Sequence, residues 1–171
     1  MDDFWKSYGI TAQEYGAAYQ CYPLFGRVHC AELALSAAFL VGMALWYRRS
    51  SVRTRKTIRA GVALALLVDE LFLLLGMALT GQWDWSYLPL HLCSIHVFVC
   101  LYDTLTDSAW CKEELYALCV PGAVLALLCP GWLNVPSWWS LINLHSVSLH
   151  VLLMLYPVLL VVGGLLAGGL V

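Results

Sequence analysis

The sequence IRAGVALALLVDELFLLLGMALT, residues 58–80, is the segment that decides the fold class. It is largely apolar, but two adjacent carboxylates, Asp69 and Glu70, lie near its middle. About 20 mostly apolar residues are enough for an α-helix to cross the hydrocarbon core of a bilayer. The segment therefore predicts a transmembrane helix that carries two acidic side chains at mid-depth.

Further apolar runs predict helices of the same kind at 28–47, 85–102, 115–129 and 138–162. The run at 115–129 is the shortest, and Pro121 predicts a kink or tilt within it. Hydrophobic residues make up 61% of the 171 residues and charged residues only 12%, which excludes a disordered chain, a disulfide scaffold and an ordinary soluble enzyme. The formal net charge of −2 offers no basic surface for nucleic acid. We predict an all-α, polytopic transmembrane helical bundle of about five spans.

The basic residues predict the orientation of this bundle. Six of the nine Lys and Arg residues lie at 48–59, between the first two spans, and the positive-inside rule places this loop in the cytoplasm. Residues 1–27 are then an extracytoplasmic segment, and residues 28–171 form the bundle. Five tryptophans are expected at the outer boundary: Trp83, Trp85, Trp132, Trp138 and Trp139. The apolar end at 163–171 suggests that the natural chain continues beyond Val171.

Ionisable side chains inside a bilayer are costly and usually mark function. The predicted spans contain His29, Glu32, Asp69, Glu70, His91, Cys93, His96, His145 and His150. Nearly all fall in the outer half or at mid-depth, so we expect them to converge on one polar cavity. Structural roles are the alternative: a His29–Glu32 pair, an Asp69–hydroxyl pair, or helix capping and headgroup anchoring by His91 or His145. Glu70 lies deepest, and a histidine from the third or fifth span is its expected partner.

Helical geometry limits which of these residues can share a site. Cys93 and His96 are three residues apart and share a face, whereas His91 is expected to point away from Cys93. His150 shares a face with Ser146 but diverges by about 140° from His145 at 100° per residue. Not every histidine can therefore enter the same site.

A set of short motifs resembles a known family. The segment LPLHLC at 88–93 is similar to the hallmark of YwaF-like bacterial membrane proteins and their eukaryotic relative, transmembrane protein 164. His29, Glu70-Leu71, Ala126–Pro130 and the pair His150 and Pro157 follow in the family's order. The resemblance covers about residues 25–162. A more remote likeness is to the androgen-induced membrane hydrolases.

The resemblance implies a bundle with more spans than these five, in a bacterial plasma membrane, and an acyltransferase that moves fatty acyl chains between phospholipids. Cys93 and His150 correspond to its catalytic cysteine and histidine. The supporting polar residues would be Glu70, His91, His96, His145 and His29, and Glu70 or His91 could orient the His150 ring. The partners would be membrane lipids, with a phospholipid acyl donor and a lyso-lipid acceptor, and no cofactor or metal is expected.

Two other functions are open on the sequence alone. A small transporter or ligand-binding module would use the histidines and carboxylates to bind a solute or relay protons. A metal site formed by His91, Cys93, His96 and Glu70 is less favoured, because the expected divergence of His91 and Cys93 spoils chelation from one helix.

Overall fold

The computed structural model describes residues 2–164, and throughout this range the regular structure is helical. The predicted all-α class is confirmed. The elements in chain order are η1 (Asp3–Trp5), α1 (Tyr8–Tyr15), α2 (Arg27–Arg49), α3 (Val52–Leu79), η2 (Trp85–Tyr87), α4 (Leu92–Thr106), α5 (Ala109–Glu114), η3 (Leu115–Cys119), α6 (Val120–Leu128) and α7 (Leu141–Val162).

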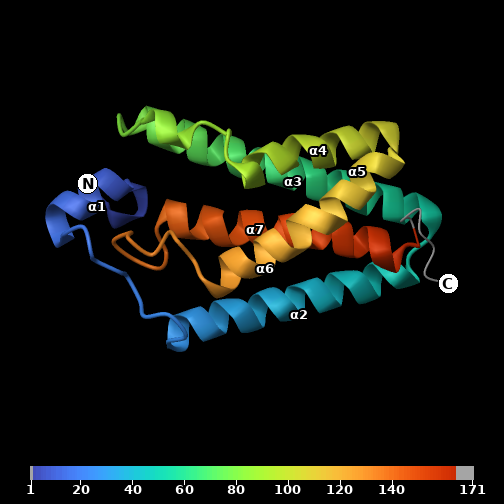
Figure 1. Cartoon of the computed structure of the whole chain (residues 1–171), viewed down its shortest axis with the longest axis horizontal. Coiled ribbons are helices and arrows are strands. Elements are labelled where there is room, and N and C mark those ends of the chain that lie inside the picture. Colours follow the sequence, from blue (N-terminus) through green and yellow to red (C-terminus); the bar gives the residue numbers. More distant parts are fainter. Residues whose placement is uncertain (1, 165–171) are drawn as a thin grey trace.

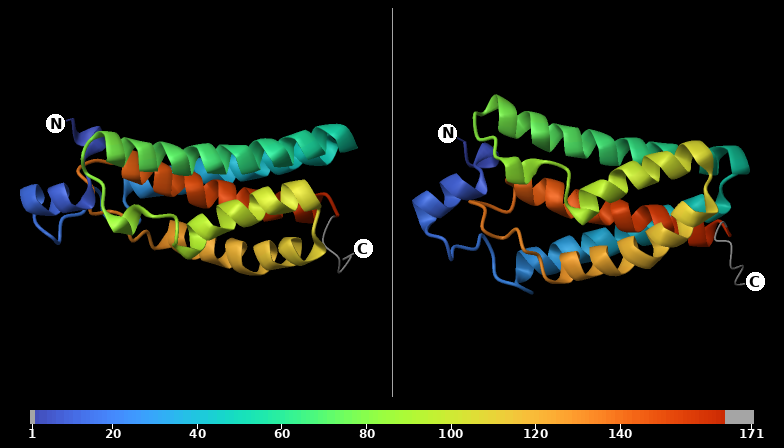
Figure 2. Two further views of the ribbon diagram at one scale, coloured as in Figure 1. Left: turned by 90° about the horizontal axis from the view of Figure 1, so that it is seen from above. Right: turned by 45° about the horizontal axis from the view of Figure 1, so that its top comes forward.

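The long helices lie side by side, with α7 at the centre (Figures 1 and 2). α7 packs against α2, α3, α4 and α6, and is the most buried of the long helices. Within residues 2–164, four segments are long and apolar enough to cross a membrane: α2, α3, the stretch Trp85–Thr106, and α7. Together they identify an integral membrane protein. Residues 2–26 and the loops at 80–91 and 129–140 gather at one end of the bundle, here called the cap end. The opposite end, with residues 48–59, is called the basic end.

The fourth predicted span is a broken helix rather than one long helix. α5, η3 and α6 follow one another without a gap over residues 109–128, and η3 is a π-helical turn. The π-helical turn ends at Cys119, and Pro121 follows as the second residue of α6. Proline lacks a backbone N–H donor and its ring crowds the preceding turn, which accounts for the loss of regular α-helical hydrogen bonding here.

The third span begins later than the apolar run predicts. Residues 85–87 form the separate 3-10 turn η2, and α4 begins only at Leu92. Pro89 is the physical reason, because a proline disfavours helical geometry in the residue before it, and Leu88 is extended with φ −58° and ψ 140°. Cys93 therefore lies in the first turn of α4 instead of two turns inside a helix.

The predicted basic loop at 48–59 is also different in the structure. α2 continues to Arg49 and α3 begins at Val52, so only Ser50 and Ser51 form the connection. Ser51 caps α3 by accepting a hydrogen bond from the Thr54 N–H, which favours an early helix start. The basic residues occupy helix ends rather than an extended loop.

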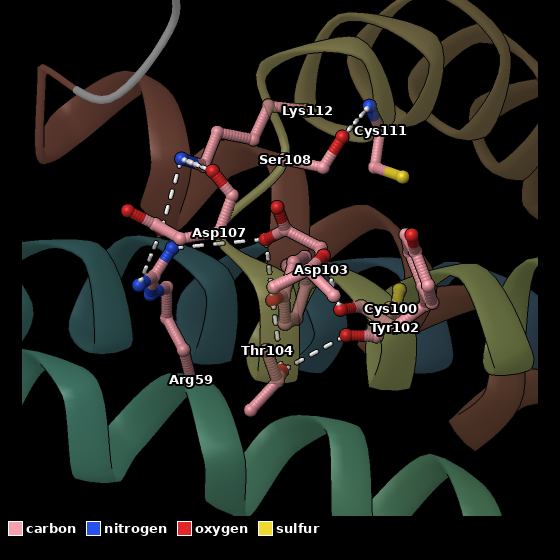
Figure 3. A network of polar contacts seen from close by, with 11 residues as sticks. Arg59, Cys100, Tyr102, Asp103, Thr104, Asp107, Ser108, Cys111 and Lys112 are labelled. Atoms are coloured by element: carbon pink, nitrogen blue, oxygen red, sulfur yellow. Dashed lines mark hydrogen bonds and ion pairs between the residues drawn. The ribbon is translucent and has the colours of Figure 1, made fainter.

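Arg59 is not free at the membrane surface but belongs to a polar network at the basic end. Figure 3 shows its guanidinium directed at two carboxylates, Asp103 and Asp107. Arg59 Nη2 lies 3.2 Å from Asp107 Oδ1, and Nη1 lies 3.7 Å from Asp103 Oδ2. Lys112 reaches Asp107 Oδ1 at 2.9 Å, and Tyr156 donates to Asp103 Oδ2 at 2.8 Å. The network ties α3, α4, α5 and α7 together.

The predicted orientation leads to a labelling experiment. Val52 is 73% exposed at the start of α3, and Asp84 is exposed in the cap-end loop. With exposed Cys30 and Cys129 replaced by serine, we expect a Val52→Cys variant to react with an impermeant maleimide only after the cells are opened. Asp84→Cys should react in intact cells. The reverse pattern would place the basic end outside.

Residues 2–26 form a cap over one end of the bundle. Trp5 packs where α3 and α7 meet: a Cβ on Gly76 would lie 2.9 Å from its ring and 2.8 Å from Leu141. The Gln82 side chain accepts from the Ser7 N–H at 2.6 Å and donates to Trp5 O at 2.7 Å. The Cys21 N–H donates to Leu133 O at 2.9 Å. The predicted N-terminal segment is thus a packed part of the bundle.

Candidate functional site

A cavity of about 610 Å³ lies at the cap end of the bundle. Its walls come from the cap (Tyr8), α3 (Glu70), α4 (Cys93), the 129–140 loop (Trp132) and α7 (His145 and His150). The predicted convergence on one cavity therefore holds for Glu70, His91, Cys93, His145 and His150. It does not hold for His29 or His96.

Cys93 is half-buried in the cavity wall and is not in a disulfide. It is the second residue of α4, and the His91 side chain at the N-cap makes no capping hydrogen bond. The first N–H groups of a helix have no partner within the helix, and the helix dipole places partial positive charge there. Both features can stabilise negative charge that develops on a ligand atom beside this turn.

His150 lies on α7 with one ring nitrogen engaged. Nδ1 donates to Ser146 O at 2.6 Å, and Trp132 stacks on the ring with centroids 4.9 Å apart. Among the described residues Nε2 has no hydrogen-bond partner, so in the neutral ring it carries a lone pair. The expectation that Glu70 or His91 orients this ring is wrong, because the Ser146 carbonyl accepts from Nδ1 one helical turn earlier.

His145 lies between the two carboxylates of α3. Its Nδ1 is 3.1 Å from Asp69 Oδ2, and its Nε2 is 3.8 Å from Glu70 Oε2. The predicted histidine partner of Glu70 is therefore confirmed as His145, from the fifth span. Ser148 Oγ lies 3.0 Å from both Asp69 oxygens, so the predicted hydroxyl partner of Asp69 is also present. Glu70 is 3% exposed, and its Oε2 has no hydrogen-bond partner.

Two geometric expectations about the cavity are wrong. His91 is the N-cap of α4 with extended backbone, φ −68° and ψ 149°, so helical spacing does not apply to it. His91 lines the cavity with Cys93, and its Nε2 donates to Ser86 O at 2.8 Å. It lies at the N-cap of α4, the helix-end position that was the alternative, but its side chain makes no capping hydrogen bond. His145 and His150 diverge along α7 but both reach the cavity, because it extends around a broad part of the helix.

His29 and His96 have structural partners elsewhere. His29 accepts from the Phe25 N–H at Nδ1 and donates from Nε2 to Leu127 O at 2.8 Å. It does not pair with Glu32, which instead contacts Tyr22 Oη at 2.7 Å and Asn143 Nδ2 at 3.0 Å. His96 donates to Leu92 O and pairs with Glu114 Oε1 at 2.7 Å.

Cys93 and His96 do share a side of α4, as their spacing predicts. Both line a small apolar crevice between α4 and the η3–α6 segment, which also includes His150. Cys93 and His150 thus border two spaces, the cavity and the crevice.

The model of the TMEM164 family matches residues 24–167. The chain belongs to this family. The match covers every helix from α2 to α7 and includes all of the cavity residues except Tyr8 of the cap. No curated protein and no solved structure matches the chain.

Sequence reasoning missed two aromatic residues of the site in this TMEM164 family member. Trp132 was expected at the membrane boundary with the other tryptophans, but it is 8% exposed and stacks on His150. Tyr8 comes from the cap, and burial raises the pKa of its phenol, which therefore stays protonated in the cavity wall. The nearest signal in the sequence was the density of aromatic residues near the N-terminus. It did not indicate which of these side chains would face the cavity.

The residues proposed for a metal site are not grouped as ligands. The His91 ring pairs with Ser86 O, and the His96 ring with Leu92 O and Glu114 Oε1. Within residues 2–164, no group of three His, Cys, Asp or Glu side chains is placed to hold a metal ion.

Proposed function

We propose that this protein transfers acyl chains between phospholipids through a thioester on Cys93, with His150 as the base. The observation that carries the proposal is the shared position of these two residues. Both line the cap-end cavity, and the His150 Nε2 lone pair has no competing partner there. Membership of the TMEM164 family is consistent with this pairing, because the family match covers both residues.

In the first half-reaction His150 Nε2 takes the proton from the Cys93 thiol, and the sulfur attacks the ester carbonyl of a phospholipid. The carbonyl carbon forms a bond to sulfur and loses its bond to the glycerol oxygen. The imidazolium returns the proton to that oxygen, and a lyso-lipid leaves. In the second half-reaction His150 deprotonates the hydroxyl of another lyso-lipid, which attacks the thioester and restores the thiol.

The start of α4 supplies a place for the negative charge that develops on the carbonyl oxygen. The backbone N–H groups of Leu92, Cys93 and Ser94 are in its first turn and have no partner within the helix. Donors of this kind beside a nucleophile can stabilise a tetrahedral intermediate. Ser94 and Cys93 both line the cavity, which puts this turn next to the substrate space.

A direct test looks for the thioester and for exchange. The purified protein is incubated with phosphatidylcholine that carries a labelled acyl chain, and then with lyso-phosphatidylcholine. We expect label on the peptide containing Cys93, released by neutral hydroxylamine, and labelled diacyl product after the acceptor is added. Label on the exposed Cys30 or Cys129 alone, or no exchange, would contradict the proposal.

A proton-coupled transporter is the second candidate, and the arrangement around His145 favours it. The ring has a carboxylate near each nitrogen, and the buried Glu70 Oε2 is not hydrogen-bonded. Such a cluster can hold and pass a proton. A transporter would tolerate loss of the Cys93 thiol, whereas the thioester mechanism would not.

The cluster itself can be tested with Glu70→Gln. The amide keeps the size of the side chain, so we expect the fold to be retained. Acyl transfer should fall about tenfold, because the carboxylate near the His145 ring is lost. His145→Gln should cause a similar loss, and the double variant should lose little more if the two act as a unit. Glu113→Gln, at an exposed carboxylate on α5, is the control. Unchanged transfer in Glu70→Gln would leave this carboxylate with a packing role only.

A further inference from the structure

A narrow crevice separates α4 from the η3–α6 segment and reaches the same two residues as the cavity. Leu92 on α4, Leu118 and Gly122 on the η3–α6 side, and Leu153 on α7 form its apolar walls. Cys93 and His150 lie at its inner limit and also line the cavity. The Cys93 sulfur is therefore at the junction of a space with many polar groups and a space lined mainly by hydrocarbon.

The crevice opens toward the lipid-facing side of the bundle. Leu92 is 62% exposed and Leu118 is 48% exposed, so both present hydrocarbon outward. A Cβ added at Gly122 would meet no atom within 4 Å, which means that open space lies beside this residue. The enclosed free volume is only about 20 Å³, so the crevice holds a short stretch of any chain and the bilayer holds the rest.

We propose that this crevice receives the first methylene groups of the acyl chain, while the headgroup and glycerol occupy the cavity. This inference rests on the proposed thioester on Cys93. The argument is one of chemistry at the junction: an ester joins a polar headgroup to a hydrocarbon chain, and its carbonyl must lie at the sulfur. The acyl chain then leaves between α4 and α6 without crossing the polar cavity. In that cavity, hydrocarbon would take the place of water that hydrogen-bonds to the polar side chains.

The glycine at position 122 allows a specific test. Gly122→Leu adds a branched side chain beside the crevice, its Cβ meets no atom within 4 Å, and leucine favours a helix more than glycine does. Gly61→Leu is a matched control, because Gly61 is exposed on α3 and also has nothing within 4 Å of an added Cβ. Leu118→Ala makes the opposite change, since it widens the same crevice.

The readout is thioester formation on Cys93 from two phosphatidylcholines, one with butanoyl chains and one with palmitoyl chains. For Gly122→Leu we expect the palmitoyl-to-butanoyl ratio of rates to fall about tenfold, since a small change of fit in an apolar pocket has an effect of this size. Gly61→Leu should leave the ratio unchanged, and Leu118→Ala should not lower it.

An unchanged ratio in Gly122→Leu, or an equal loss with both donors, would overturn the crevice as the chain site while leaving the thioester mechanism intact. A thioester that forms with neither donor in the unsubstituted protein would instead contradict the proposed function itself. Size-exclusion profiles in detergent compare the folding of the variants, and Leu118→Ala tests the inference independently if Gly122→Leu does not fold.

Discussion

Replacing Cys93 by serine is expected to reduce phospholipid acyl transfer by about 10³-fold or more, as loss of a nucleophile does in other acyl-transfer enzymes. A serine hydroxyl is a poor nucleophile near neutral pH unless a strong base activates it. His150 is oriented by the Ser146 carbonyl and not by a carboxylate, so it lacks the partner that stabilises an imidazolium in serine enzymes. A thiol needs less help from a base, because a thiolate forms more readily than an alkoxide and is intrinsically a strong nucleophile.

The matched control for this prediction is Cys129→Ser. Cys129 is exposed at the end of α6 and lines neither the cavity nor the crevice. We expect this variant to keep transfer within a few-fold of the unsubstituted protein. Substantial transfer by Cys93→Ser would rule out the thioester on Cys93 as an intermediate. The rates are compared in the exchange assay with labelled phosphatidylcholine.

The second large effect is expected at the basic end. Arg59→Met should lower the free energy of unfolding by about 3–5 kcal/mol, the usual effect of removing one partner from a buried ion pair. Asp103 is fully buried, and its Oδ1 already has no hydrogen-bond partner. Without the guanidinium 3.7 Å away, the Asp103 carboxylate would keep the hydrogen bond from the Tyr156 hydroxyl of α7 but would lose the positive charge of Arg59.

Unfolding by sodium dodecyl sulfate in mixed micelles measures this loss. Arg53→Met, at an exposed position in the first turn of α3, is the control and should change stability little. The double variant Arg59→Met with Asp103→Leu should recover much of the loss, because no unpaired charge is then buried. Equal stabilities of Arg59→Met and Arg53→Met would show that the network contributes nothing to the fold.

Asp107 is the part of this network most open to solvent. Hydrogen bonds from Lys112 and from Arg59 lower its pKa below the usual value. A carboxyl with a lowered pKa in the folded state stabilises the protein above its unfolded pKa and loses this effect as the pH falls through the folded value. Asp107 therefore keeps its negative charge at neutral pH.

The helical class and the polar convergence could be predicted because they depend on composition and on the cost of burying charge. The Glu70–His145 and Asp69–Ser148 pairs follow from the same cost, since a carboxylate inside a bundle must find a partner on a neighbouring helix. These predictions needed only the order of polar residues along each span.

The local geometry around Cys93 could not be predicted in this way. The predicted span at 85–102 assumes that residues 85–91 are helical, but Pro89 delays α4 until Leu92. Because of the same break, His91 does not follow helical spacing and lies in the cavity wall. The role of Trp132 depends on the path of the 129–140 loop, which has no periodic pattern to read.

The contacts of Trp5 limit when the cap can pack during biosynthesis. The cap is made first, yet its packing site includes Leu141 of α7, and its backbone bond at Cys21 needs Leu133 of the preceding loop. The N-terminal segment can therefore reach its packed position only after Leu133 and Leu141 have been synthesised. Tyr8 belongs to this segment, so the cavity wall that it forms depends on contacts with residues far along the chain.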